Sequence, residues 1–200
     1  MKPSLEIKMD KTIQNEKLKE ANQHYRDRDF KSAFNPFLKA AEEGISEYQR
    51  LVGWMYYVPE GVTKNVEQAE YWFRRAASVG DAEAQFGLGL VLQNTDQGQE
   101  AKKWFELSVQ QGFAASQYRL AMMYLHGLNG INVDIEKGQG LLADGAKAGH
   151  LNSMKWHARE LMQKNNNLFT KIKGALWFVK FTVLTIVVAF KDTNSPRFLY

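Results

Sequence analysis

The sequence has no cysteine among its 200 residues, which excludes a disulfide framework, a thiol nucleophile and a thiolate metal site. This absence fits a reducing compartment. The opening stretch, MKPSLEIKMDKTIQNEK, holds no apolar run, so a cleaved secretory signal is not expected. Only four prolines occur, and the hydrophobic content of 44% suits a globular, helical chain of one or two domains.

The residue sets that enzymes and metal sites require are also missing. His150 and His157 lie close in sequence, but they have neither a paired carboxylate nor a third ligand. No H-E-x-x-H or P-loop pattern occurs. The glycines of GQGLLA, residues 138–143, imitate a dinucleotide-binding fingerprint but fall in a helical pattern without the strand that such a site needs. We therefore expect no enzymatic activity, no cofactor, no metal and no small-molecule substrate.

A two-helix pattern recurs along the chain with a period near 36 residues. It is clearest in residues 48–80, where two apolar helical patterns are joined by a Pro-Glu-Gly loop. The second helix of each copy shares small residues, bulky residues and a closing glycine, in the sets Ala33, Pro36, Phe37 and Gly44; Ala69, Trp72, Phe73 and Gly80; Ala101, Trp104, Phe105 and Gly112; Gly138, Leu141, Leu142 and Gly149. The closing glycines are predicted to end helices in the left-handed conformation. A period of this kind predicts a solenoid, in which each helix pair rests on its neighbours.

The segment LVGWMYYVPEGVTKNVEQAEYWFRRAASVGDAEAQFGLG, residues 51–89, resembles the Sel1-like repeat, a relative of the tetratricopeptide repeat. The matching elements are the L-G-x-M-Y turn of helix, the G-V loop, the A-x-x-W-F-x-x-A-A helix and the G-D-A-x-A-Q restart. The resemblance covers about Ser46 to Met162. It implies an all-α fold: a right-handed α-solenoid of about four antiparallel helix pairs, with a capping helix and a C-terminal hydrophobic helix.

Four segments follow from these patterns. Residues 1–11 are predicted to form a flexible lead-in, and residues 12–163 the repeat solenoid. Residues 164–191 are predicted to form a basic hydrophobic helix, membrane-associated or packed, and residues 192–200 a polar tail. Residues 164–200 carry six basic residues and one acidic residue, so the rest of the chain is close to neutral. A near-neutral body does not favour nucleic-acid binding.

By the same resemblance, the first helix of each pair lines a concave face that binds peptides or protein domains. The predicted partner-binding residues, at the groove positions of the tetratricopeptide repeat, are Tyr25, Arg50, Trp54, Tyr57, Phe86, Leu90, Tyr118, Met122 and Arg159. Aromatic residues and arginine dominate protein-binding hot spots. The alternative is that several of them pack against neighbouring helices.

The C-terminal hydrophobic helix admits three interpretations. Its apolar part, Gly174 to Phe190, is 17 residues long with one charge, Lys180, so it is a marginal membrane span. It could instead lie in the plane of a membrane surface, or pack on the open end of the solenoid. The predicted lipid contacts are Leu176, Trp177, Phe178, Phe181, Leu184, Ile186, Val187 and Phe190.

These observations predict a non-enzymatic scaffold or adaptor that holds a protein partner. The expected location is the cytoplasmic side of a membrane, the inner membrane in a bacterium, with a soluble cytoplasmic protein as the alternative. Members of the family commonly act as adaptors in bacterial membrane-associated complexes. The alternative function is an immunity-type protein that neutralises a toxin or effector by direct binding.

Overall fold

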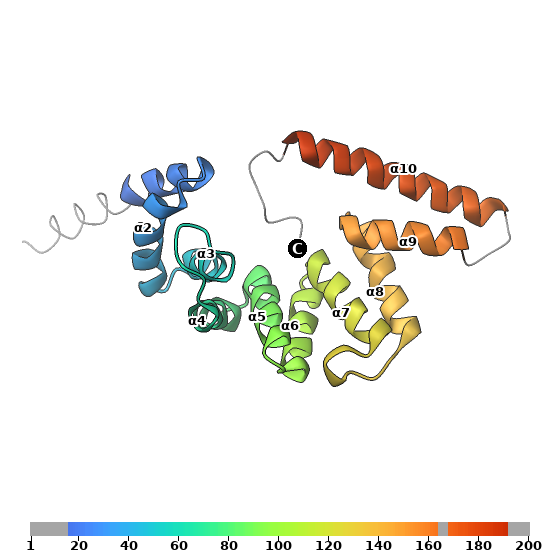
Figure 1. Cartoon of the computed structure of the whole chain (residues 1–200), viewed down its shortest axis with the longest axis horizontal. Helices are drawn as coiled ribbons and strands as arrows, with labels where there is room; N and C mark the ends of the chain where they lie inside the picture. The colour runs from blue at the N-terminus through green and yellow to red at the C-terminus, as the bar shows by residue number, and fades with distance from the viewer. Residues whose placement is uncertain (1–15, 164–167, 192–200) are drawn as a thin grey trace, which may run out of the picture. The chain divides into compact units, whose positions relative to one another are not determined.

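The structure, a computed structural model, describes residues 16–163 and 168–191 (Figure 1). Within these residues all the regular secondary structure is helical and there is no strand, so the predicted all-α class is confirmed. A helix over residues 16–26 comes first. The helices that follow are α2 (Phe30–Glu42), α3 (Ser46–Tyr57), α4 (Val66–Ser78), α5 (Ala82–Asn94), α6 (Gly98–Gln110), α7 (Ala114–His126), the short 3₁₀ helix η1 (Leu128–Gly130), α8 (Ile135–Lys147), α9 (Leu151–Gln163) and α10 (Leu168–Lys191).

The described helices divide between two compact units, Met1–Gly87 and Leu88–Tyr200, with the division inside α5. In the first unit, α3 packs on both α2 and α4. The predicted core positions of this unit are confirmed, because Phe37 and Phe73 have no exposed surface and Trp72 is 4% exposed. The Phe37 ring lies 5.5 Å from the Tyr25 ring and 5.0 Å from the Tyr48 ring. Aromatic rings therefore lie at the centre of the contacts between these helices.

Glycines on the first helix of a repeat make room for the phenylalanine of the second helix. A Cβ on Gly53 or on Gly87 would lie 2.7 Å from ring carbons of Phe73, well inside an ordinary contact distance. In the second unit, a Cβ on Gly89 would lie 2.5 Å from the fully buried Phe105 ring. The small residues therefore let a helix backbone rest directly on an aromatic ring.

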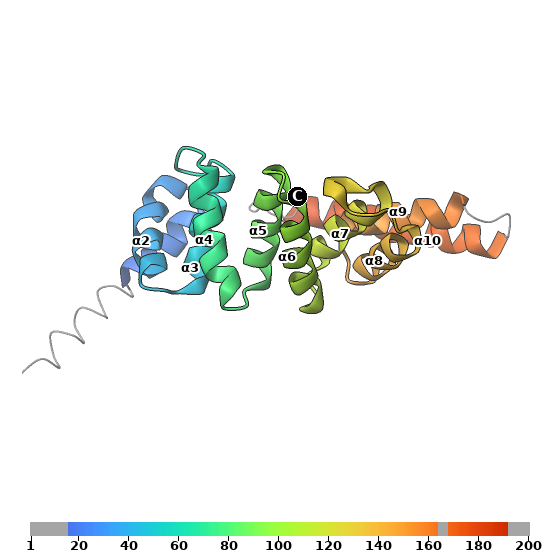
Figure 2. The ribbon, with the colours of Figure 1, turned by 90° about the horizontal axis from the view of Figure 1, so that it is seen from below.

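In the second unit, α7 packs on α6 and α8, and α9 packs on α8 and α10 (Figures 1 and 2). The core of this unit includes Phe105, Leu142 and Met154, which have no exposed surface. The glycines of residues 138–143 lie in α8, as the sequence predicts, and Gly138 packs against Leu125 of α7.

The four closing glycines lie at the ends of helices and have positive φ, which confirms their predicted role. Gly80, with φ of +94°, follows α4 and allows the chain to turn directly into α5. Asp81 then caps α5 by accepting a hydrogen bond from the backbone N–H of Ala84 at 2.8 Å. The closing glycine and the N-cap residue together keep the connection between α4 and α5 short.

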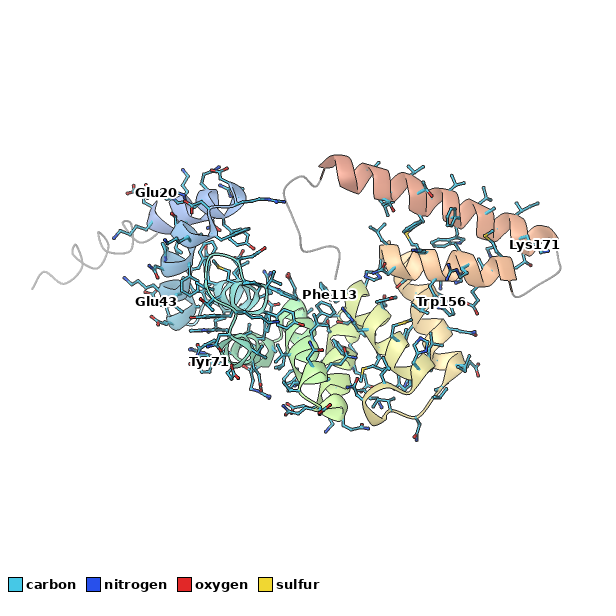
Figure 3. The ribbon with its side chains drawn as sticks, in the orientation of Figure 1. Glu20, Glu43, Tyr71, Phe113, Trp156 and Lys171 are labelled. Atoms are coloured by element: carbon cyan, nitrogen blue, oxygen red, sulfur yellow. The ribbon has the colours of Figure 1, made fainter. Side chains whose placement is uncertain are left out.

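The C-terminal helix α10 lies along α9 (Figure 1). Gly174 of α10 is buried against α9, and the Trp177 ring meets the His157 ring edge-on at 5.5 Å. One face of α10 is therefore packed, as the third interpretation of this helix predicts. Apolar side chains of α10 outside this contact stay exposed, among them Leu176 at 65% and Val179 at 59%. Figure 3 shows side chains on the side of α10 that points away from α9.

Candidate protein-interaction face

Three of the predicted groove residues are not available at the surface. Trp54 is 7% exposed, Phe86 is 3% exposed and Leu90 is 4% exposed. The Trp54 ring meets the Phe73 ring at 5.0 Å and the Phe86 ring at 6.2 Å. The Trp54 ring thus contacts the second helix of its repeat, and all three side chains belong to the core. The assignment of these three residues to an open groove is corrected accordingly.

Arg50 is half-buried and forms ion pairs between the first helices of two consecutive repeats. Its Nε donates to Asp81 at 3.0 Å, and its guanidinium also donates to Glu83 at 2.6 Å. Burial raises the pKa of Glu83, and the Arg50 charge opposes that rise. Because Asp81 also caps α5, Arg50 holds the start of this helix in place. A structural role therefore explains Arg50, and its binding role stays a prediction.

Tyr25 and Tyr57, also in the first unit, are half-buried. The Tyr25 ring packs edge-on against Phe30 at 5.1 Å, and the Lys64 ammonium lies 5.8 Å from the centre of the Tyr57 ring. Each tyrosine keeps part of its surface open, so each remains a predicted contact residue.

The second unit presents the more open part of the predicted face, on α7 and α9. Tyr118 and Met122 on α7 are half-buried, and Arg159 on α9 is exposed. Lys155 is exposed on the same helix as Arg159. The Tyr118 ring lies 5.2 Å from the His150 ring at the start of α9, which links the two helices. This set, Tyr118, Met122, Lys155 and Arg159, is called the α7–α9 face below.

Sequence reasoning missed two residues at this face, Arg119 and His150. Arg119 is half-buried, and its Nε atom has no hydrogen-bond partner among the described residues. His150 Nδ1 accepts a hydrogen bond from the backbone N–H of Ser153 at 3.3 Å and so caps α9. Burial, with the nearby Arg119 charge, lowers the pKa of His150 to about 4, so the ring is neutral at pH 7. One signal could have found Arg119: it is the only charged side chain in the α7 sequence AASQYRLAMMYLH.

The charges of α7 and α9 are mainly positive. Arg119, Lys155 and Arg159 stand against a single acid, Glu160, which is half-buried. A face that joins a tyrosine and a methionine to these cations suits an acidic protein segment with apolar side chains.

A hollow of about 430 Å³ lies elsewhere in the second unit, between α6, α7 and the loop before α8. Its lining includes Lys102, Tyr124 and Asp134. Both charged groups of the lining are already engaged: Lys102 pairs with Glu106 at 3.8 Å, and Asp134 caps α8 through the N–H of Lys137. We therefore assign no ligand to the hollow.

The described residues contain no group of three or more histidine or acidic side chains able to hold a metal ion. In residues 16–163 and 168–191, no helix has both the length and the apolar character needed to cross a membrane.

Among the predicted lipid contacts, Leu176, Phe178 and Val187 are exposed. Trp177, Phe181 and Leu184 are half-buried and follow helical spacing from the packed Gly174. Those three lie on the side of α10 that packs on α9, so only part of each side chain is open, and their contact with lipid stays a prediction. The side chains of Ile186 and Phe190 lie outside what the structure describes.

Helix pairs repeated in tandem, joined by glycine turns, define the chain as an α-solenoid repeat protein. The Sel1 repeat family matches it at residues 46–81, 82–113 and 114–150, which together make up just over half of the chain. The chain therefore belongs to the Sel1 repeat family, and the predicted resemblance is confirmed. Each matched repeat contains one helix pair: α3 with α4, α5 with α6, and α7 with α8.

Two solved structures resemble the chain. One is a protective antigen present in uropathogenic Escherichia coli strains that displays an SLR fold, with a TM-score of 0.72 and 24% identity over 80% of this chain and 36% of the antigen. The other is a Sel1 repeat protein from Oxalobacter formigenes, with a TM-score of 0.69 and 25% identity over 80% of this chain and 69% of that protein.

A curated relative, an F-box protein of Arabidopsis thaliana, is 34% identical over 97 residues. This match takes in 48% of the chain and 26% of the F-box protein, so the chain spans only a minor part of that relative. Sel1 repeats build a protein-interaction fold that is generally non-catalytic.

Proposed function

We propose that this protein is a non-enzymatic scaffold that holds an acidic segment of a partner protein on the α7–α9 face, at the cytoplasmic surface of a membrane. Sel1 repeat proteins are protein-interaction scaffolds, which supports the general role. The observation that carries the proposal is that equivalent positions of two consecutive first helices hold half-buried Tyr118 and Met122 on α7 and exposed Lys155 and Arg159 on α9. Hot-spot residues of this kind are typical of peptide-binding grooves in helical repeats.

The membrane part of the proposal is supported by α10. This helix carries lysines and exposed large apolar residues together, with Ile172 at 50% and Leu176 at 65% exposure. A basic and apolar helix favours the anionic surface of the cytoplasmic leaflet.

The test is partner capture by chemical cross-linking in cells, followed by affinity measurement with the purified partner. Tyr118→Ala and Arg159→Ala should each weaken binding about tenfold or more, because truncated anchors typically lose more than 1 kcal/mol. Lys103→Ala is the matched control, since Lys103 is an exposed cation on the second helix α6. If both face variants bind as tightly as the wild type, the α7–α9 face is not the binding site.

The identity of the captured protein separates the scaffold from the immunity-type alternative. Recovery of membrane assembly or synthesis proteins agrees with a scaffold. Recovery of a single toxin, bound with loss of its activity, would replace the scaffold by a neutralising partner.

A further inference from the structure

Helices α9 and α10 lie beyond the three matched repeats, and their packing is that of a further repeat. Gly174 on α10 rests on α9, where an added Cβ would lie 2.8 Å from Met162 Cγ and 3.1 Å from the carbonyl oxygen of Ala158. Gly174 also begins the sequence G-x-x-W-F, which matches the A-x-x-W-F of α4 and α6.

The same contact occurs one repeat earlier, between α7 and α8. An added Cβ on Gly138 would lie 2.6 Å from Leu125 Cγ and 3.2 Å from the carbonyl oxygen of Ala121. The three corresponding residues of α9 and α10 stand 36 or 37 positions further along the chain. Equal residue spacing and equal contacts make α10 the second helix of a divergent repeat that follows residue 150.

This equivalence exposes an unusual set of residues on the outer side of α10. Four of them are apolar and largely exposed: Ile172 at 50%, Leu176 at 65%, Val179 at 59% and Val183 at 55%. The spacing of four, three and four residues places them in one line along the helix. The equivalent residues are Glu67, Tyr71, Arg74 and Ser78 in α4; Gln99, Lys103, Glu106 and Gln110 in α6; and Glu136, Gly140, Ala143 and Lys147 in α8. We call the four α10 residues the outer stripe.

Another repeat of the array would leave most of the outer stripe uncovered. At the Leu176 position the equivalents Tyr71, Lys103 and Gly140 are exposed, although each of their helices is followed by a further repeat, whereas at the Val179 position Arg74, Glu106 and Ala143 are half-buried. Figure 3 labels Tyr71, which is 50% exposed on α4. The position faces outward in every repeat, and only in α10 is it filled with large aliphatic side chains. An apolar line at an outward position points to a partner outside the array.

The charges beside the stripe indicate the chemistry of that partner. Lys171, Lys173 and Lys180 are exposed on α10, and the helix sequence contains no aspartate or glutamate. By helical geometry, Lys173 and Lys180 border one side of the stripe and Lys171 lies toward the other. Two copies of α10 packed stripe to stripe would bring like charges together without an acid to offset them. An anionic surface is the complementary partner.

Two polar side chains of α10 are also suited to an apolar environment. The hydroxyls of Thr182 and Thr185 donate to the backbone carbonyls of Phe178 and Phe181 at 2.9 and 2.8 Å. Their hydrogen-bonding needs are thus met within the helix when water is absent.

We infer that α9 and α10 form a divergent repeat whose outer stripe lies in the plane of an anionic phospholipid surface, with the apolar side chains among the acyl chains and the lysines at the headgroups. Because the opposite face of α10 is packed on α9, only the outer part of this helix enters the lipid. The inference rests on the proposed membrane location and specifies the side chains that produce it.

The experiment is flotation of the purified full chain with protein-free vesicles of phosphatidylcholine, with and without phosphatidylglycerol. The wild type should bind the anionic vesicles and lose binding as salt is raised. The double variant Leu176→Gln with Val183→Gln should bind at least about tenfold more weakly, because two apolar side chains leave the lipid. Tyr71→Gln, at the position equivalent to Leu176 in α4, should bind as the wild type does. Both variants change exposed residues, so circular dichroism melting should stay near that of the wild type.

Each other outcome is informative. Equal binding by the double variant and the wild type would overturn the outer stripe as the lipid contact, while membrane location through other residues would stand. A chain that fractionates with cell membranes but ignores protein-free vesicles would overturn the inference and leave the proposed function intact. Retention after carbonate extraction would indicate a span and overturn the in-plane arrangement. A dimer that the double variant converts to monomer would assign the stripe to self-association instead.

Discussion

The contact between Gly53 and the Phe73 ring gives a direct test of how the repeats are held together. A Cβ introduced by Gly53→Ala would lie 2.7 Å from Phe73 Cδ1, against an ordinary contact of 3.4 Å or more. Phe73 has no exposed surface, and Gly87 meets the same edge of its ring, so the ring has little room to move. Overpacking of this kind typically destabilises by about 1–3 kcal/mol, and the better helix propensity of alanine offsets about 1 kcal/mol of that loss. We expect a net loss of up to about 2 kcal/mol.

A double-mutant cycle isolates this contact. Phe73→Leu shortens the side chain, so Gly53→Ala should cost little in the Phe73→Leu background, with a coupling energy of about 1 kcal/mol or more. Urea unfolding followed by tryptophan fluorescence measures each variant, and Trp54 lies 5.0 Å from the Phe73 ring as a local reporter. Gly140→Ala on α8 is the control, since an added Cβ there meets nothing within 4 Å and should stabilise by about 1 kcal/mol. Additive effects of the two changes would refute the proposed contact.

Three further outcomes are expected. In urea unfolding, Trp72→Ala should destabilise by about 3–5 kcal/mol and Trp104→Ala by only about 1–2 kcal/mol. The reason is that Trp72 is 4% exposed whereas Trp104 is half-buried, and equal losses would contradict it. Arg50→Ala should lower stability by about 2 kcal/mol in thermal melts at pH 7, since it leaves Asp81 without its ion-pair partner, and an unchanged melt would show the pair to be unimportant. The folded-state pKa of His150, about 4, lies below the unfolded value of 6.5, so its contribution to stability is present above pH 6.5 and is lost as the pH falls toward 4. His150→Asn keeps a cap for α9 and removes the titrating ring. Between pH 7 and pH 5 this variant should therefore lose about 2 kcal/mol less stability than the wild type, and equal losses would contradict the burial of the ring.

The fold could be predicted from the sequence because its signals are local and repeated. The period near 36 residues, the paired bulky positions and the closing glycines each occur several times. This repetition distinguishes the pattern from a chance match. The structure confirms them, with Phe73 and Phe105 fully buried and Gly80 and Gly112 at positive φ.

The interaction face was only partly predictable. Helical spacing tells which side of a helix a residue is on, but not whether a large side chain on that side reaches a neighbour. Trp54 and Phe86 fall at groove positions, yet both contact the core, because a tryptophan ring extends far enough to meet Phe73 on the next helix. His150 was missed for a related reason: its cap on α9 and its burial beside Arg119 depend on tertiary packing.

The C-terminal helix shows the same limit. The sequence predicted a basic apolar helix, but not that its packed side would be Gly174, Trp177 and the residues in line with them. Apolar residues occur on every side of α10, so the sequence alone does not show which side packs on α9. The repeat register, once seen in the structure, separates the packed side from the outer stripe.

Two buried glutamines form hydrogen bonds between consecutive helix pairs, and these bonds have a consequence for the evolution of repeat arrays. Gln49 donates to the carbonyl oxygen of Ala41 at 3.1 Å, and Gln85, one repeat later, donates to that of Ala77 at 3.4 Å. Each glutamine recognises a backbone group, which any residue at position 41 or 77 would provide. A repeat that keeps its glutamine can therefore follow a neighbour of different sequence. Duplication or exchange of whole repeats leaves this hydrogen bond intact, and side chains need to change only at the positions where aromatic rings pack on glycines.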